Sequence, residues 1–372
     1  MTPMKIETEH VTNGLLIHVA GRLDAQAAGG FEAALNTAVE SDLPRAVIEM
    51  TGVDYINSVC VRSLLQMYKR MREQKRFMEI MGTQPAVRKL LLVVGLDQLL
   101  PPSEGPARGI DQIKLRADEF GQTWDTVRQS LRDVFTALRI EPARARQAID
   151  DIVRLGCGGL PEAQIEAELK PLLADLNLAA RFAGGRPERV RLIHDQIARY
   201  VPAGASVLDL GCGDGLVGAS FADGARQVQL ADVKDRNRTA LPFARYDGRT
   251  LPFPDKSFDV ALLVTVLHHC DDPAAFLREV MRVTRRRIVA IETVYLSEPH
   301  RSFNIFFDWF YNRVLTDGDA VPYKFNSPEG WWFLFRKQHL AVTGCDDIGL
   351  EQAAIPEYHW LYALAVPQPA EK

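Results

Sequence analysis

A short apolar segment that runs directly into a glycine-rich turn constrains the fold of this chain more than any other feature. The segment spans residues 207–210, and Gly211, Gly213 and Gly215 follow it. Glycine has no Cβ, so its backbone can approach a ligand closely and adopt positive φ at low cost. Residues 216–222 are predicted to begin a helix whose free N–H groups point towards the same turn. This order of elements predicts an α/β sheet with a nucleotide-type cofactor site at its carboxyl edge.

A dinucleotide is one candidate for this site. Residues 213–218 satisfy the pattern G-x-G-x-x-G, and Asp232 stands about where a ribose-binding carboxylate would be expected. However, the first glycine after the strand is Gly211, and counting from there places Leu216 at the third glycine position of the pattern. An enzyme that uses NAD is therefore kept as an alternative.

The turn more closely resembles the first motif of class I S-adenosylmethionine (SAM)-dependent methyltransferases, in particular their type 11-like domains. In that family an acidic residue stands two positions before the first glycine, as Asp209 stands before Gly211. A carboxylate suits SAM, which has no pyrophosphate and carries a sulfonium and an ammonium cation. The resemblance implies SAM as the cofactor and a Rossmann-like, seven-stranded methyltransferase domain.

Later segments extend this resemblance. Residues 227–233 are predicted to be a second strand that ends in a carboxylate, which implies that Asp232 binds the ribose hydroxyls, with Asp235 as the alternative. Asp247 would accept the adenine amino group, and the nearly continuous apolar residues 260–266 predict the fourth strand. The cofactor-binding residues that the resemblance implies are Asp209, Gly211, Cys212, Gly213, Gly215, Asp232, Val233, Asp247, Gly248 and Val264.

Two adjacent histidines are the candidate catalytic residues. His268 and His269 follow the fourth predicted strand, where the family often has one or two histidines at the lip of the site. Methyl transfer from SAM is an in-line displacement, so the protein mainly positions and desolvates the reactants, and a base is needed only if the acceptor loses a proton. Histidine's ordinary pKa near neutrality suits that task. A purely structural pair at the end of a strand remains the alternative.

Residues 1–105 alternate predicted strands and helices and form a small α/β domain. Their segments 21–24, 47–56 and 94–96 resemble the STAS domain of bacterial anti-sigma-factor antagonists. The resemblance implies a protein partner and a role in regulation or docking.

The phosphorylation site typical of STAS domains is altered in this chain. The family places its phosphate-accepting serine where this sequence has Val59. The preceding Ser58 is predicted to be the N-cap of the following helix, and whether it is phosphorylated stays open.

The remaining sequence divides into two further parts. Residues 106–185 predict a helical connector, which is either a spacer or a cap, and residues 186–372 the methyltransferase domain. An arginine triplet at residues 285–287 is expected to be a solvated turn between a helix and a strand. Residues 295–335 form an aromatic-rich insertion after the fifth strand, and a lid of this kind suits a small apolar or aromatic acceptor such as a lipid or quinone.

The composition limits the partners and the compartment. A formal net charge of −4 over 372 residues gives no reason to expect nucleic acid as a partner. The five cysteines are scattered without metal-ligand spacing, so no metal site is expected and a reducing cytoplasm is favoured. No apolar run approaches the roughly 18 residues of a spanning helix. The protein is predicted to be cytoplasmic, with peripheral membrane association left open.

Two functions are therefore considered. The first is a SAM-dependent methyltransferase that acts on a small apolar or aromatic acceptor and uses its STAS domain for regulation or docking. The second is a catalytically inactive SAM-binding sensor or scaffold that signals through the STAS domain. The intact acidic and glycine positions favour SAM binding in both.

Overall fold

The structure is a computed structural model that describes residues 4–11, 14–96, 99–100, 122–158, 160–184, 186–316, 322–350 and 357–367. The chain divides into two compact units: residues 1–106 with 296–298, and residues 107–295 with 299–372. Within these described ranges, none of the helices combines the length and apolar character required to traverse a bilayer.

The first unit contains a four-stranded sheet in the order β1-β2-β3-β4. Strands β1 and β2 are antiparallel, and the other pairs are parallel. The strands are β1 (Lys5–Val11), β2 (Gly14–Leu23), β3 (Arg45–Ile56) and β4 (Phe77–Met81). The helices are α1 (Ala28–Glu40), α2 (Ser58–Glu73) and α3 (Pro85–Val93). This is the small α/β domain that the sequence predicts.

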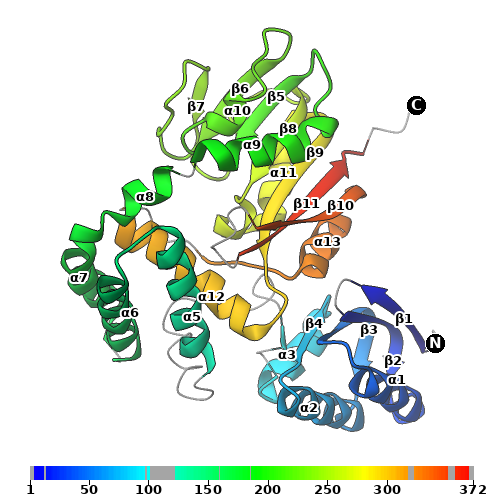
Figure 1. Cartoon of the computed structure of the whole chain (residues 1–372). Helices are drawn as coiled ribbons and strands as arrows, with labels where there is room; N and C mark the ends of the chain where they lie inside the picture. Colours follow the sequence, from blue (N-terminus) through cyan, green and yellow to red (C-terminus); the bar gives the residue numbers. More distant parts are fainter. Residues whose placement is uncertain are drawn as a thin grey trace, which may run out of the picture. The chain divides into compact units, whose positions relative to one another are not determined.

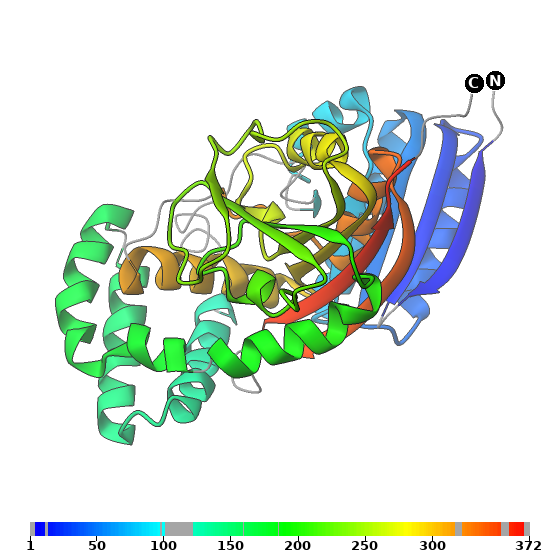
Figure 2. The ribbon, with the colours of Figure 1, turned by 90° about the horizontal axis from the view of Figure 1, so that it is seen from above.

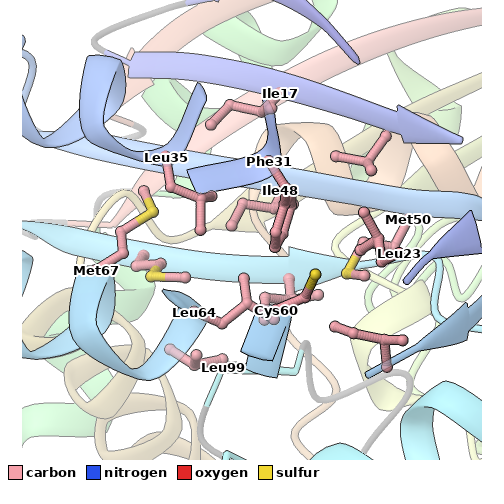
Figure 3. Packing of buried hydrophobic residues seen from close by; sticks show 14 of the residues in the cluster. Ile17, Leu23, Phe31, Leu35, Ile48, Met50, Cys60, Leu64, Met67 and Leu99 are labelled. Atoms are coloured by element: carbon pink, nitrogen blue, oxygen red, sulfur yellow. The ribbon is translucent and has the colours of Figure 1, made fainter. Parts of the chain in front are cut away.

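The core of this unit lies between the sheet and its helices. Phe31 and Leu35 recur four residues apart on α1, so both lie on the same helical face. Figure 3 shows them beside Ile17 of β2 and Ile48 of β3, and all four side chains are buried. Burial of each such side chain stabilises the fold by about 1.5–3 kcal/mol.

The N-terminus of α2 differs from the sequence prediction by one position. The N-cap is Asn57, whose backbone is extended and whose side-chain oxygen accepts a 2.9 Å hydrogen bond from the Cys60 N–H. Ser58 is the first residue of the helix and is exposed, so its assignment as the N-cap is wrong. Asparagine is an equally good N-cap, and here it is the residue that reaches the free N–H group of the first turn.

The second unit is built on a seven-stranded sheet in the order β10-β11-β9-β8-β5-β6-β7. Strand β11 is antiparallel to both of its neighbours, and the remaining pairs are parallel; Figure 2 shows β10 and β11 (orange and red) next to each other. The strands are β5 (Ser206–Leu210), β6 (Gln227–Asp232), β7 (Phe243–Arg245), β8 (Phe258–Val264), β9 (Thr284–Val294), β10 (Ala341–Leu350) and β11 (Tyr358–Ala365). The predicted seven-stranded α/β fold is confirmed.

Helices cover both faces of this sheet. One face packs against α9 (Arg186–Ile197) and α10 (Leu216–Ala219), with Ile193 of α9 and Val217 of α10 in the same buried cluster as Val207. The other face carries α11 (Pro273–Val283) and α13 (Pro328–Lys337), where Phe335 packs edge-on against Tyr362 of β11 at 5.0 Å. The parallel strands are buried on both faces, which explains their continuous apolar sequence.

The arginine triplet lies in a strand and not in a turn. Strand β9 begins at Thr284, and Arg287 pairs with Val260 on one side and Ala365 on the other. Arg285 and Arg286 are exposed and reach the Asp259 carboxylate at 3.4 and 3.9 Å. The predicted turn is therefore wrong, because strand pairing extends β9 back to Thr284. The arginines lie at the solvated N-terminal end of this strand, where charged side chains are tolerated.

The helical connector packs within the second unit against the aromatic insertion, as Figure 1 shows. Its helices are α5 (Gln122–Ala137), α6 (Pro142–Cys157), α7 (Glu162–Leu173) and α8 (Leu178–Gly184). Trp124 and Phe182 make edge-to-face contacts with Phe306 and Phe307 of α12 (Glu298–Trp309), at 5.8 and 5.9 Å. The connector therefore covers α12.

Candidate functional site

The glycine turn after β5 has a backbone that only glycine adopts easily. Gly211, Gly213 and Gly215 have φ of 69°, 53° and 79°. A Cβ on Gly211 would lie 2.6 Å from Cγ2 of Val266, and one on Gly215 would lie 2.7 Å from Cδ1 of Leu230. Side chains at these two positions would therefore be strained in φ and would also collide with packed neighbours. The geometry explains why glycine stands at these positions.

Asp209 fastens the turn to the helix that follows it. The residue is 2% exposed, and its Oδ2 accepts a 2.7 Å hydrogen bond from the Gly218 N–H. Burial raises the pKa of Asp209 to about 7; the Gly218 N–H opposes this shift, and the charges of Asp232 and Asp214 add to it. The contact that the structure shows is thus with the protein backbone, and direct binding of a cationic cofactor group stays a prediction.

Asp232 also holds the turn. It ends β6, and its Oδ2 accepts a 2.8 Å hydrogen bond from the Gly213 N–H while Oδ1 accepts one of 3.2 Å from the Lys234 N–H. The alternative, Asp235, is exposed and accepts from the Asn237 N–H at 3.2 Å. Asp232 is therefore the carboxylate that the fold brings to the glycine turn.

The other predicted cofactor residues follow the neighbouring strands. Asp247 is exposed, and the N–H groups of Thr250 and Arg249 donate to its Oδ1 at 2.7 and 2.8 Å, which lowers its pKa. A Cβ on Gly248 would lie 3.5 Å from Val233, so these two positions adjoin each other.

Cys212 and Val264 complete the predicted cofactor set. Burial raises the pKa of the Cys212 thiol, so this cysteine is inert. Val264 is the last residue of β8 and is half-buried.

A strained turn leads from β8 to the two histidines. Thr265 has φ of 56°, which is rare for a β-branched residue, and its N–H donates to the Ile291 carbonyl at 2.7 Å. The 3₁₀ turn η4 (Leu267–His269) follows immediately. Strained backbone persists only where the surrounding structure fixes it. The strained Thr265 therefore fixes the direction in which the chain enters η4, which carries both histidines.

His268 is held by a buried glutamate. Its Nδ1 lies 2.7 Å from Oε2 of Glu292, and Oε1 of Glu292 accepts from the N–H groups of Val266 and Leu267 at 3.0 and 2.7 Å. Glu292 is completely buried, and Phe325 stacks on the His268 ring at 4.5 Å. A carboxylate only accepts hydrogen bonds, so this contact places the proton on Nδ1 and leaves a lone pair on Nε2.

His269 forms a second histidine–carboxylate pair. Its Nε2 lies 3.1 and 3.2 Å from the two oxygens of Asp308, which also accept a 2.9 Å hydrogen bond from Asn312. Burial disfavours the charged imidazole, but the Asp308 carboxylate outweighs it and raises the pKa of His269. Burial likewise acts against the charged Asp308, but His269 lowers the pKa of that carboxyl. The two histidine rings meet edge to face at 4.2 Å.

The carboxylates of this cluster are candidate functional residues that sequence reasoning missed. Glu292 is a lone acid within an apolar strand, and Asp308 is a lone acid between aromatic residues of α12. A charge is rarely buried without a partner, so a single acid in an otherwise apolar strand is a signal of a polar site. Asp308 also shows that the aromatic insertion contributes a side chain to the site.

The aromatic residues of the insertion are mostly core. Within the insertion, α12 continues into the π-helical turn η5 (Phe310–Leu315), and α13 begins at Pro328. Tyr323 has φ of 50° and is 3% exposed, and its hydroxyl has no hydrogen-bond partner among the described residues. The fully buried aromatic side chains include Phe303, Phe306, Trp309, Phe310, Trp331 and Phe335.

Two family models match the chain. The STAS domain model matches residues 5–107, and the methyltransferase domain model matches residues 208–289. The second range contains the glycine turn, Asp232 and both histidines.

Sequence relatives agree with these matches. An uncharacterized methyltransferase of Mycobacterium sp. strain JLS is 37% identical over 91 residues, which cover 23% of this chain and 36% of the relative. A demethylmenaquinone methyltransferase of Beutenbergia cavernae is 32% identical over 141 residues, covering 35% of this chain and 57% of the relative. The chain thus spans only about a third to about half of the length of these two proteins.

A longer match and one solved structure complete the comparison. The structure of a methyltransferase in complex with the Haloferax volcanii Trm112 methyltransferase activator matches 52% of this chain and 96% of its own chain, at 18% identity and a TM-score of 0.42. An uncharacterized methyltransferase of Mycobacterium avium strain 104 is 36% identical over 212 residues, covering 50% of this chain and 83% of the relative. The chain therefore belongs to the methyltransferase family and carries a STAS domain ahead of its methyltransferase domain.

Proposed function

We propose that the chain is a SAM-dependent methyltransferase that acts on a small apolar or aromatic acceptor. The observation that carries the proposal is the pair of carboxylates tied to the glycine turn. The Gly213 N–H donates to Asp232, and the Gly218 N–H donates to Asp209. In a dinucleotide site, backbone N–H groups of this kind bind a pyrophosphate. Here the two N–H groups donate to aspartate carboxylates, so they are not free to bind a pyrophosphate. The negative charge of the carboxylates favours a cofactor with cationic groups over NAD.

The roles of the turn residues follow from their positions. When bound, SAM would supply a methyl group activated by a sulfonium, and Asp232 at the end of β6 would accept from its ribose hydroxyls. Gly213, beside which a Cβ would meet nothing within 4 Å, leaves room for the cofactor next to the backbone. Asp247 stands at the next strand end for the adenine amino group. The half-buried Val264 supplies an apolar contact where β8 ends.

The two histidines would serve the acceptor. His268 and His269 lie just after the end of β8, and Val266, two residues before His268, lies against Gly211 of the turn. Their proposed role is to promote loss of the acceptor's proton while the cofactor and acceptor are held in line. Glu292 and Asp308 would orient the two rings during this step.

The acceptor is proposed to be apolar or aromatic because of the insertion that supplies Asp308. This insertion is rich in aromatic side chains, and the helices of the connector cover it. A relative named as a demethylmenaquinone methyltransferase supports a quinone-like acceptor. The STAS domain is proposed to dock a protein partner through the junction of β3 and α2, where Tyr55 near the end of β3 is 41% exposed and Val59 in the first turn of α2 is 44% exposed.

Calorimetry and a transfer assay test the proposed function. The full chain should bind SAM and S-adenosylhomocysteine at one site and should not bind NAD. With methyl-labelled SAM, a reduced naphthoquinone should then become labelled. Tight NAD binding would overturn the assignment of the cofactor. SAM binding without transfer to any phenol or quinol would favour the sensor or scaffold in place of the enzyme.

A further inference from the structure

Three side chains that can each bind a metal ion lie together after the end of β8. His268, His269 and Asp308 each offer one ligand atom, and these atoms all lie within 4.8 Å of one another. The His269–Asp308 contact spans 3.1 Å. Ligands around a tetrahedral zinc ion stand about 3.4 Å apart, so a small inward shift of one side chain would close the set around an ion.

We propose that His268, His269 and Asp308 form a binding site for a first-row divalent cation such as Zn²⁺. Two imidazoles and one carboxylate are the donors that such ions prefer, whereas Mg²⁺ favours oxygen donors alone. The catalytic role of the ion rests on the proposed function. The binding of the ion is inferred from the geometry of the side chains alone.

The outer partners of the ligands support the site. Glu292 holds Nδ1 of His268 at 2.7 Å, which leaves the lone pair of Nε2 for an ion. Asn312 donates to Asp308 at 2.9 Å and fixes that carboxylate. Histidine ligands of metals almost always donate their other N–H to such a partner, and a carboxylate is a common choice. Oε1 of Glu292 holds the turn by accepting from the N–H groups of Val266 and Leu267, and Oε2 would serve as the outer partner of the metal ligand His268.

The charge balance points in the same direction. Glu292 is completely buried and Asp308 is 13% exposed at its side chain. In the part of the chain that the structure describes, neither carboxylate forms an ion pair with a lysine or an arginine. With both imidazoles neutral, as metal binding requires, the two buried carboxylates would carry two negative charges. A divalent cation would balance them.

The ion would activate the acceptor as a Lewis acid. Binding of a hydroxyl oxygen to the cation lowers the pKa of that hydroxyl, so its proton passes to bulk water. The oxygen lone pair then forms the new bond to the methyl carbon while the sulfur–carbon bond of SAM breaks and leaves S-adenosylhomocysteine. No other reactant is required, and the acceptor class becomes a phenol, quinol or alcohol.

Titration of the metal alone tests the site. Chelator-treated full chain, carrying Cys157→Ser and Cys345→Ser to remove two exposed thiols, is titrated with Zn²⁺ and with Co²⁺ in the absence of SAM. We expect one ion per chain, a Co²⁺ absorption band of low coordination number, and no binding of Mg²⁺. A chain that takes up no Zn²⁺ or Co²⁺ overturns the proposal. If it still binds SAM, the proposed function stands without the ion.

Substitutions locate the ion. His268→Ala and Asp308→Ala should each weaken Zn²⁺ binding more than tenfold, and Glu292→Gln should weaken it by about 10–100-fold. His194→Ala is the matched control, because that ring contacts Ser220 and Phe221 and should leave the affinity unchanged. Equal Zn²⁺ affinity in all four variants would place the ion elsewhere and refute the site.

A measurement on the unsubstituted ligand cluster guards against misfolded variants. Zn²⁺ should protect His269, whose side chain is 33% exposed, from diethylpyrocarbonate, as read by mass spectrometry, and should not protect His194. Equal modification of His269 with and without Zn²⁺ contradicts the proposal even if every variant is unfolded. An ion that binds while SAM does not would leave the site standing and reject the proposed function.

Discussion

The carboxylate of Asp209 accepts a 2.7 Å hydrogen bond from the Gly218 backbone N–H in the interior of the protein. Burial raises the pKa of Asp209 to about 7, whereas an aspartate in an unfolded chain titrates near 4. The folded state therefore holds more protons than the unfolded state between about pH 4 and pH 7. By linkage, the contribution of Asp209 to stability is fully present below about pH 4 and is lost as the pH rises through about 7.

Replacement of Asp209 by asparagine should remove this dependence, because the amide oxygen can still accept from Gly218 but cannot be charged. The stability of Asp209→Asn relative to wild type should rise between pH 5 and pH 8, by up to a few kcal/mol. Urea unfolding can be followed by tryptophan fluorescence, since all five tryptophans lie in the second unit. In Asp247→Asn the difference should stay constant, because the pKa of Asp247 is lowered. A constant difference for Asp209→Asn as well would contradict the raised pKa.

The collision between a Gly211 side chain and Val266 gives a second prediction. Gly211 and Gly204 have similar φ, 69° and 74°, but a Cβ on Gly204 would meet nothing within 4 Å. Gly204→Ala should cost about 1–2 kcal/mol from the backbone alone. Gly211→Ala should cost about 1–3 kcal/mol more, because its methyl group overpacks against Val266. Equal losses in urea unfolding would show that Val266 can move away freely.

The third prediction separates the two candidate ribose ligands. Asp232→Ala should weaken SAM binding by about 1.5–3 kcal/mol, or about 10–150-fold, because charge-assisted hydrogen bonds are lost together with the anchor of Gly213. Asp235→Ala should leave the affinity within about twofold, because that side chain is exposed. Isothermal titration of both variants measures the difference, and the reverse order of affinities would move the ribose site to Asp235.

Features set by neighbouring residues could be predicted from the sequence, and contacts between residues far apart in the chain could not. The glycine turn and the acids at strand ends are local, so spacing alone indicates them. The contacts of His268 with Glu292 and of His269 with Asp308 join residues 24 and 39 positions apart. Whether such residues meet depends on the pairing of β8 with β9 and on the path of α12, which no local pattern contains.

Two smaller errors have the same origin. Arg285–Arg287 look like a solvated turn in isolation, but pairing with β8 and β11 draws Arg287 into a strand. The N-cap of α2 is one residue before the predicted serine, because Asn57 and Ser58 are both good caps and only the backbone path decides between them.

The fourth prediction concerns the docking of the helical connector. Glu166 of α7 is 8% exposed, and its two oxygens accept from Nε and Nη2 of Arg313 at 2.8 and 3.0 Å. A double-mutant cycle with Glu166→Ala and Arg313→Ala should give a coupling energy of about 1–3 kcal/mol, since removal of Arg313 leaves a buried carboxylate without its ion-pair partner. The exposed pair Glu188–Arg191 should couple by no more than about 0.5 kcal/mol. Similar coupling in both pairs would mean that α7 is not held by this contact.

The last prediction tests the cap of α2 in the STAS domain. Asn57→Ala removes the acceptor of the Cys60 N–H and should destabilise α2 by about 1 kcal/mol, whereas Ser58→Ala should change its stability by less than about 0.5 kcal/mol. Ser58→Asp should be neutral or slightly stabilising, because a negative charge in the first helical turn interacts favourably with the helix dipole.

Hydrogen exchange of peptides from residues 57–73, measured by mass spectrometry on the full chain, reports the opening of this helix directly. We expect exchange about fivefold faster in Asn57→Ala and unchanged in Ser58→Ala. Faster exchange in Ser58→Ala than in Asn57→Ala would return the capping role to the serine, and faster exchange in Ser58→Asp would mean that a negative charge at this position unfolds the helix.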